Sequence, residues 1–207
     1  MDFKTYSEIK IETLEEKTNN DIFQNRPILF ESPMYYDGEF FDRFNDVEYN
    51  HEWAINNKIL ENFIGLVKIY KTEYKLYRIN HEGLIWDFYI SGKSPFELIS
   101  AFVKYKNTNN EMLLEGVWQI DTVLGLIRSL IIEYYMPKFN AIISGAITNN
   151  KGKIFLQNLA KEFVKLGKSV KLLINNKEYS YEFDKQEDYW KSSNGISNID
   201  KRIKYSN

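Results

Sequence analysis

One stretch of the chain combines serine, glycine and lysine in the way that phosphate-binding loops do. Ser144-Gly145 follows an apolar run and Gly152-Lys153 opens an amphipathic segment, which is the position between a strand and a helix where a phosphate would bind. The spacing is wrong, because six residues separate these glycines and Ile154 follows Lys153, whereas a Walker loop needs four residues and then Ser or Thr. Ser144 also lacks a glycine two residues before it, so the nucleophile elbow is absent. The stretch therefore indicates an ordinary connection between a strand and a helix.

His51 and His81 are the only imidazoles in the chain, and they limit its acid–base and metal chemistry. Neither has a second His at helical spacing, so no zincin motif exists. His81 is predicted to lie in a hairpin turn. His51 stays open as a general base, although a solvated or core-edge histidine is the better interpretation. Cysteine is absent, which excludes disulfides, thiolate metal sites and Cys nucleophiles. From the residues alone we assign no catalytic residue and no metal site.

The composition excludes several classes of protein. The 207 residues include 27 Lys+Arg and 29 Asp+Glu, and 43% are hydrophobic, which is ordinary for a globular protein. A dedicated nucleic-acid binder would be basic, so we expect none here. No apolar run is long enough for a membrane span, and the first residues do not form a secretory signal. Ile, Asn, Lys and Tyr together supply 82 residues, a bias toward AT-rich codons that suits an AT-rich bacterium or its phage.

The hydrophobic pattern predicts a mixed α/β (α+β) fold, with a central sheet flanked by helices in a single domain. A strand, helix, strand, helix, strand order in the second half predicts a crossover core, and the first half adds an antiparallel meander. We divide the chain into an N-terminal extension with the first elements (1–60), the α/β core (61–190) and a C-terminal tail (191–207). In the first half we expect a helix in 53–63, a hairpin over 66–79, a turn at 81–83 and a strand at 84–90. A helix that starts at Pro95 follows, with Phe96, Ile99, Phe102 and Val103 on one face.

In the second half we expect a strand at 112–118, a buried helix at 123–135, a strand at 141–147, an amphipathic helix at 152–166 with Gly167 as its C-cap, and a hairpin over 170–183.

The segment from Met112 to Phe163 is the most informative part of the sequence. A strand runs into a loop that ends at Gly125, and a buried helix, a second strand and a second helix follow. This arrangement resembles the fold of the Gcn5-related N-acetyltransferases (GNAT), especially their divergent phage-encoded members. The resemblance covers about residues 60–183 by element order.

The resemblance implies where acyl-coenzyme A would bind if the family's chemistry were retained. In that family the loop after the fourth strand reads Arg/Gln-x-x-Gly-x-Gly/Ala, and its backbone N–H groups hold the pyrophosphate. Gly125 matches the last position, but Val123 stands at the first glycine and Ile120 at the Arg/Gln position. A β-branched Val resists the backbone conformations that such a loop uses. The residues implied for this alternative alone are Gln119, Ile120, Asp121, Thr122, Val123, Leu124 and Gly125.

A second family feature is also missing. The last helix of the family commonly carries a Tyr, in a pattern like Ala-x-x-Phe-Tyr, as general acid to the leaving thiolate. Here Ala160-Lys161-Glu162-Phe163 fits the pattern, but Val164 takes the place of the Tyr. The resemblance thus implies a retained fold with lost or altered chemistry, with no catalytic residue and no cofactor.

Two main hypotheses of function follow. The first is a non-catalytic structural component of a phage particle, of the tail or neck ring type, located in the virion after assembly in the bacterial cytoplasm. Its partners would be other virion proteins and copies of itself. We expect the tail to bury Ile196, Ile199, Ile203 and Tyr205 against another subunit, because it cannot form its own core. The alternative is an active, divergent acyl-CoA N-acyltransferase, cytoplasmic and dependent on acetyl-CoA. A host-interaction or anti-defence protein of a phage is a weaker third option.

Overall fold

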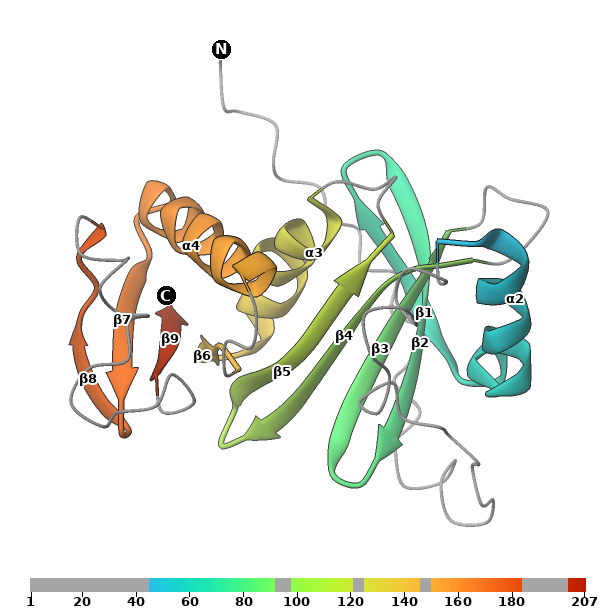
Figure 1. The fold of residues 1–207 in the computed structure, drawn as a ribbon, viewed down its shortest axis with the longest axis horizontal. Coiled ribbons are helices and arrows are strands. Elements are labelled where there is room, and N and C mark those ends of the chain that lie inside the picture. Colours follow the sequence, from blue (N-terminus) through green and yellow to red (C-terminus); the bar gives the residue numbers. More distant parts are fainter. Residues whose placement is uncertain (1–44, 92–97, 121–124, 146–149, 184–200) are drawn as a thin grey trace. The chain divides into compact units, whose positions relative to one another are not determined.

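The fold is known from a computed structural model that describes residues 45–91, 98–120, 125–145, 150–183 and 201–207 (Figure 1). The helical elements are α2 (Val47–Asn56), η2 (Ile59–Glu61), α3 (Leu126–Ser129), η3 (Leu130–Tyr135), η4 (Met136–Lys138) and α4 (Asn150–Lys165). The strands are β1 (Phe63–Ile69), β2 (Thr72–His81), β3 (Leu84–Ser91), β4 (Leu98–Thr108), β5 (Glu111–Gln119), β6 (Ala141–Ile143), β7 (Ser169–Ile174), β8 (Lys177–Ser180) and β9 (Lys201–Ser206).

These nine strands form one mixed sheet in the order β1-β2-β3-β4-β5-β6-β9-β7-β8. The α+β class with a mixed sheet, expected from the sequence, is therefore confirmed. The chain divides into two compact units. Unit 1 contains residues up to 103 together with 118–127, and unit 2 contains 104–117 and 128–207.

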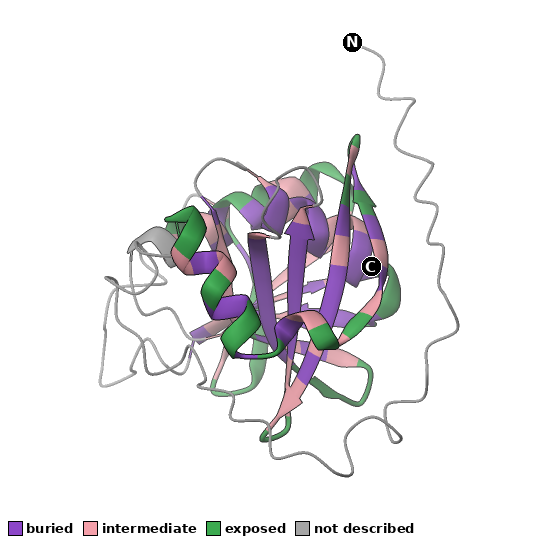
Figure 2. Ribbon diagram, turned by 90° about the vertical axis from the view of Figure 1, so that its right-hand side faces the viewer, coloured by how far each residue is buried: buried purple, intermediate pink, exposed green. Residues whose placement is uncertain are grey.

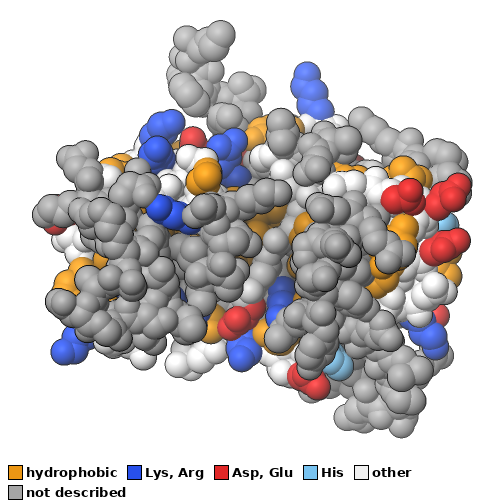
Figure 3. Space-filling view, viewed as in Figure 1, with side chains coloured by type: hydrophobic (Ala, Val, Ile, Leu, Met, Phe, Trp, Pro, Cys, Tyr) orange, Lys and Arg blue, Asp and Glu red, His pale blue; other side chains and the backbone are white. Residues whose placement is uncertain are grey.

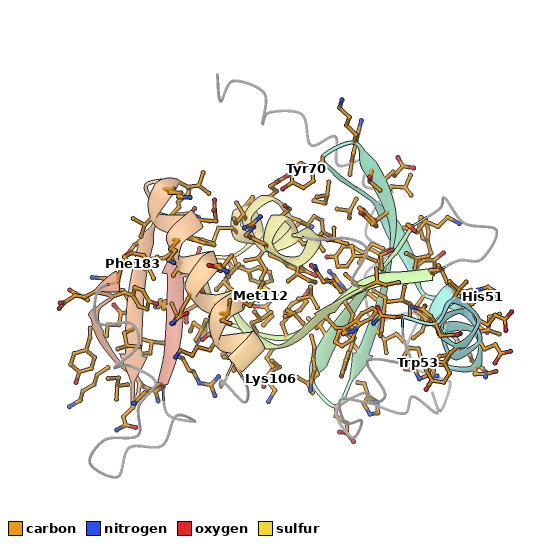
Figure 4. The ribbon with its side chains drawn as sticks, turned by 45° about the horizontal axis from the view of Figure 1, so that its top comes forward. His51, Trp53, Tyr70, Lys106, Met112 and Phe183 are labelled. Carbon is orange, nitrogen blue, oxygen red and sulfur yellow. The ribbon has the colours of Figure 1, made fainter. Side chains whose placement is uncertain are left out.

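Unit 1 contains the antiparallel strands β1, β2 and β3. Tyr70, at the tip of the β1–β2 hairpin, has a positive φ of 53°, and Glu82 and Gly83 form the next turn with φ values of 51° and 76° (Figure 4). Both hairpins were predicted, and the first turn lies slightly before its predicted position. Across the second hairpin Arg78 is the register partner of Asp87, and their side chains form a two-point ion pair with N···O distances of 2.6 and 3.0 Å.

The core of unit 1 is aromatic and lies between α2 and the strands. The Trp86 ring stacks on Phe88 with a centroid distance of 6.3 Å, and the Phe102 ring lies 5.5 Å from Trp86. From α2, Trp53 contacts this cluster, so the helix combines buried and exposed positions along its length (Figure 2). The Asp46 side chain caps the helix by accepting a hydrogen bond from the Tyr49 N–H, which satisfies one of the free donors of the first turn.

One predicted helix is wrong. Phe96, Ile99, Phe102 and Val103 were expected on one face of a helix that starts at Pro95, but residues 98–108 form strand β4. All seven residues from 99 to 105 are buried. A strand that is covered on both faces loses its alternation of polar and apolar residues, so its apolar positions fit a helical spacing by chance. The 95–97 part of the prediction lies outside the described residues.

In unit 2, β5 and β6 are neighbours and run parallel, as the sequence predicted. Their ladder pairs Glu111–Leu113 with Ala141–Ile143. The predicted strand 141–147 ends at Ile143, and residues 146–147 lie outside the described part. At the other side of the sheet β7 and β8 form the predicted hairpin, whose turn residues Asn175 and Asn176 have φ values of 50° and 61°.

The helices of unit 2 present the predicted apolar faces to the sheet. In α4 the buried positions are Leu156, Gln157, Leu159, Ala160 and Phe163, and Gly167 follows with φ +71°, as a C-cap requires. Figure 1 shows α4 lying along β7 and β9.

The predicted buried helix at 123–135 is described from Leu126 onward, and η3 within it is π-helical. Tyr135 of η3 packs edge-on against Tyr105 of β4, with ring centroids 5.5 Å apart. Pro137 lies in η4, the short helical turn with which this run ends.

The expectation for the C-terminal tail is wrong for its last residues. Ile203 and Tyr205 are completely buried, but they are buried in the chain's own unit 2 and not against another subunit. Strand β9 lies between β6 and β7 and is antiparallel to both. Residues 184–200, with Ile196 and Ile199, lie outside the described part.

Candidate functional site

The loop after β5 is the site that the sequence singled out, and its described residues belong to unit 1. Gln119 ends β5, and its side-chain Oε1 accepts a hydrogen bond from the Ile127 N–H at 3.0 Å. Ile120 is buried and its N–H donates to the Ser100 carbonyl at 2.9 Å. Gly125 has φ +80°, a conformation that favours glycine. Asp121, Thr122, Val123 and Leu124 lie outside the described residues.

These contacts decide what the described part of the loop can bind. A phosphate at a helix N-terminus needs backbone N–H groups that point at it. The Ile127 N–H, in the first turn of the α3–η3 helical run, already donates to the Gln119 amide, and the Ile120 N–H donates within the sheet. Two of the amides that flank the loop are therefore occupied by the protein itself. Gly125 has the backbone of a loop glycine, but these two amides beside it are not available to an anion.

Strand β9 places a tyrosine next to the part of α4 where the family pattern fails. Val164 is 46% exposed and supplies no acid. Its neighbour Phe163 is buried, and the ring of Tyr205 from β9 lies 4.8 Å from the Phe163 ring. The Tyr205 hydroxyl donates to the Leu156 carbonyl at 3.1 Å, and burial, reinforced by Tyr181, raises its pKa well above the usual 10.0. Tyr205 is thus a structural tyrosine, because its proton is held in a buried hydrogen bond.

Ser144 and Gly145 also have structural roles. Ser144 is fully buried, and its Oγ accepts a hydrogen bond from the Ile203 N–H at 2.8 Å. A Cβ at position 145 would lie 2.5 Å from the Leu114 carbonyl oxygen, so glycine is required where the chain leaves β6 beside β5. Arg202 donates to the Ser144 carbonyl at 3.2 Å. This polar cluster fastens β9 to the end of β6, in agreement with the interpretation that the stretch is an ordinary connection.

The two histidines do not form a site with each other or with a metal. His51 is half-buried on α2, two residues before Trp53 (Figure 4). His81 ends β2 at the predicted turn, with its Nε2 3.9 Å from the Glu82 carboxylate. In the described ranges, no three His, Asp or Glu side chains come together as a metal ion would need. None of the helices among these residues is long and apolar enough to cross a membrane.

Lys104 is an unusual residue that sequence reasoning missed. It lies in β4 and only 5% of it is exposed. Burial lowers the pKa of its ammonium group from the usual 10.5, and the Glu115 carboxylate partly opposes this shift. Its alkyl chain runs beside Gly116, where an added Cβ would make ordinary van der Waals contact with Lys104 Cβ and Cδ at 3.9 Å. A single Lys in a run of apolar residues gives no pattern, so the sequence could not have indicated its burial.

No family model, no curated protein and no solved structure matches this chain. Its function must therefore be inferred from its own residues.

Proposed function

We propose that this chain is a non-catalytic structural subunit of a phage particle, of the tail or neck ring type, built on a degenerate acetyltransferase-like fold. The hydrogen bond from the Ile127 N–H to Gln119 Oε1 carries the non-catalytic part of the proposal. It occupies one of the helix-terminal donors that would otherwise be available to a pyrophosphate. Val164 gives independent support, because it has no hydroxyl where the family carries its acid. Tyr205, the tyrosine packed on the neighbouring Phe163, gives further support, because its hydroxyl is held in a buried hydrogen bond.

The connectivity supports the acetyltransferase-like arrangement. The order β5, α3, β6, α4, β7 is the element order on which the resemblance rests. Within the sheet, β5 and β6 of this series pair in parallel, and β9 lies antiparallel between β6 and β7. A fold of this kind does not establish an activity, since function depends on the site.

The assignment to a phage particle draws on composition and on the resemblance. The AT-rich codon bias and the likeness to divergent phage-encoded members both point to a phage. An aromatic content of 16% supplies the residue types that are enriched in interface cores. The test is mass spectrometry of purified particles from the phage that encodes the chain. We expect its peptides in stoichiometric amounts, and their absence from the particles would contradict a virion role.

Coenzyme A binding tests the non-catalytic part separately. Calorimetric titration of the full chain with acetyl-CoA should show no binding up to millimolar concentration. The Gln119→Ala variant is the control for a gain of acetyl-CoA binding, because it frees the Ile127 N–H. This variant still has Val123 in the loop. Micromolar binding by the unchanged chain would refute the proposal.

One observation favours the alternative, an acyl-CoA N-acyltransferase. The β5–β6 ladder covers only Glu111–Leu113, whereas β5 continues to Gln119. Beyond Leu113, β6 no longer pairs with this edge of β5, and an extended amide-bearing chain, such as the pantetheine arm of coenzyme A, could add to it by strand-like hydrogen bonds. An assay that offers acetyl-CoA and a primary amine, and measures the coenzyme A thiol released by acetyl transfer, would detect this activity.

A further inference from the structure

The net charge of the chain is close to zero, but its two units have net charges of opposite sign. Residues 1–103 and 118–127, which make unit 1, contain 11 Lys+Arg and 19 Asp+Glu, a net charge of −8, and those among them that the structure describes contain 5 Lys+Arg and 7 Asp+Glu, a net charge of −2. Residues 104–117 and 128–207, which make unit 2, contain 16 Lys+Arg and 10 Asp+Glu, a net charge of +6. Figure 3 shows Asp and Glu side chains gathered over α2, in unit 1, and Lys and Arg side chains gathered over α4, in unit 2. Opposite charges on two units make each unit attractive to the other unit of a second copy.

The outward side of α4 combines positive charge with exposed apolar residues. Lys161 and Lys165 are exposed and stand four positions apart, so they lie on one side of the helix. Ile154 and Val164 are 56% and 46% exposed on the same helix. Lys165 meets Glu162 at 3.4 Å, an exposed pair that holds it weakly. We call these residues the α4 face: Ile154, Lys161, Val164 and Lys165.

The outward side of α2 has the matching character. Glu48, Glu52 and Ile55 are exposed at positions i, i+4 and i+7, which form one stripe along the helix. Ile55 is 51% exposed and Val47 is 40% exposed. We call Val47, Glu48, Glu52 and Ile55 the α2 face. Each face thus carries two like charges and two aliphatic side chains, and the charges of the two faces are opposite.

We propose that the α4 face of one copy docks on the α2 face of the next copy, so that the chain assembles head to tail. A contact between two different faces repeats from copy to copy, and it closes into a ring or continues as a filament. The occupant of each face is therefore a second copy of this chain. This inference rests on the proposed structural function and names the contact through which such a subunit would assemble.

The first experiment measures assembly by sedimentation velocity and light scattering of the full chain at 50 mM and 1 M NaCl. We expect concentration-dependent oligomers at low salt and at least about tenfold weaker association at high salt, where the screening length is only about 3 Å. K161E/K165E and E48K/E52K should each be monomeric. The matched controls are K106E/K177E in unit 2 and E73K/E82K in unit 1, which change the net charge equally at exposed positions outside the two faces and should still assemble.

The second experiment distinguishes head-to-tail docking from other modes. K161E/K165E keeps a functional α2 face, and E48K/E52K keeps a functional α4 face. Mixed in equal amounts, they should assemble again, because the unchanged α2 face meets the unchanged α4 face and the two reversed faces also carry opposite charges. K161Q/K165Q mixed with E48Q/E52Q should instead form 1:1 dimers that do not grow further, because the neutral faces have no charge complement. Circular dichroism melting confirms that each variant is folded, and the milder K161Q/K165Q and E48Q/E52Q pairs replace any variant that is not.

Three results would overturn the proposal: an unchanged chain that is monomeric at low salt, assembly that persists in both face variants, or a mixture that forms no dimer. A monomer that instead binds a single-stranded oligonucleotide, and loses this binding in K161E/K165E, would assign the α4 face to nucleic acid and also overturn it. These failures are distinct from failure of the proposed function, which is read from acetyl-CoA titration and from the composition of the particle.

Discussion

Strand β9 should be indispensable for the folding of unit 2, and its removal is the sharpest test of the fold. Ile203 and Tyr205 are both 0% exposed, and burial of such side chains contributes about 1.5–3 kcal/mol each. Removing residues 201–207 would also leave the facing edges of β6 and β7 without partners, at about 0.5–1.5 kcal/mol for each lost hydrogen bond. The sum is comparable to the about 5–15 kcal/mol that stabilises a typical domain. We therefore expect the chain truncated after residue 200 to lose the cooperative unfolding of unit 2.

Point variants in β9 should cause smaller losses of stability than its removal. Ile203→Ala should cost about 2–5 kcal/mol, because it opens a cavity in a fully buried position. Tyr205→Phe should cost about 0.5–1.5 kcal/mol, because it removes one buried hydrogen bond and keeps the ring on Phe163. Deleting Asn207 alone is the control, since its side chain only accepts an exposed hydrogen bond from Lys168.

The assay is urea denaturation of each chain followed by far-ultraviolet circular dichroism. The order of stability should be unchanged chain and Asn207 deletion, then Tyr205→Phe, then Ile203→Ala. A truncated chain that unfolds with the same midpoint and slope as the full chain would refute the placement of β9 in the sheet.

Three further predictions concern buried polar groups. Asn50→Ala should destabilise the chain by about 2–4 kcal/mol in urea denaturation, because the fully buried Asn50 amide bonds both the N–H and the carbonyl of Ile99, at 2.8 and 3.0 Å; an unchanged midpoint would contradict this. Asp87→Ala should cost about 3–5 kcal/mol, because it removes the carboxylate that pairs with the largely buried Arg78 guanidinium. The double variant Asp87→Leu with Arg78→Met should cost clearly less, and equal losses would show that the pair is not coupled. Burial raises the pKa of Glu133 above its usual 4.5, so the folded state favours the neutral carboxyl group and loses stability as the pH rises through that raised pKa. Glu133→Gln should therefore raise Tm at pH 7 but not at pH 4. An equal change of Tm at both pH values would refute the assignment.

Much of the fold could be predicted because local signals agreed with it. Gly83, Asn175, Asn176 and the C-cap Gly167 have a positive φ, which their residue types favour. The parallel pair β5–β6 followed from two apolar runs separated by a helix. Such features depend on a few neighbouring residues, so the sequence contains them directly.

The elements that the sequence predicted wrongly depend on long-range packing. Strand β4 is buried on both faces, and the Asn50 side chain, about fifty positions earlier in the chain, holds its Ile99 backbone. In β9 the alternation was present, with Ile203 and Tyr205 buried between half-buried Arg202 and Lys204, but a polar face made it resemble a solvated tail. At the candidate site, the residue types of the loop predict lost or altered chemistry, which stays a prediction. The Gln119 contact to Ile127 could not be predicted, because it depends on a backbone geometry that spacing does not reveal.

The position of β9 has a consequence for biosynthesis. Ala141 pairs with Ser206, so the ribosome must add 65 residues after the start of β6 before this pairing can form. In the meantime β6 and β7 each present an unpaired edge with apolar neighbours, the kind of surface that promotes aggregation of a nascent chain. Long-range pairing of this kind also slows folding. Synthesis at low temperature, or with chaperones that shield strand edges, should therefore increase the yield of correctly folded chain.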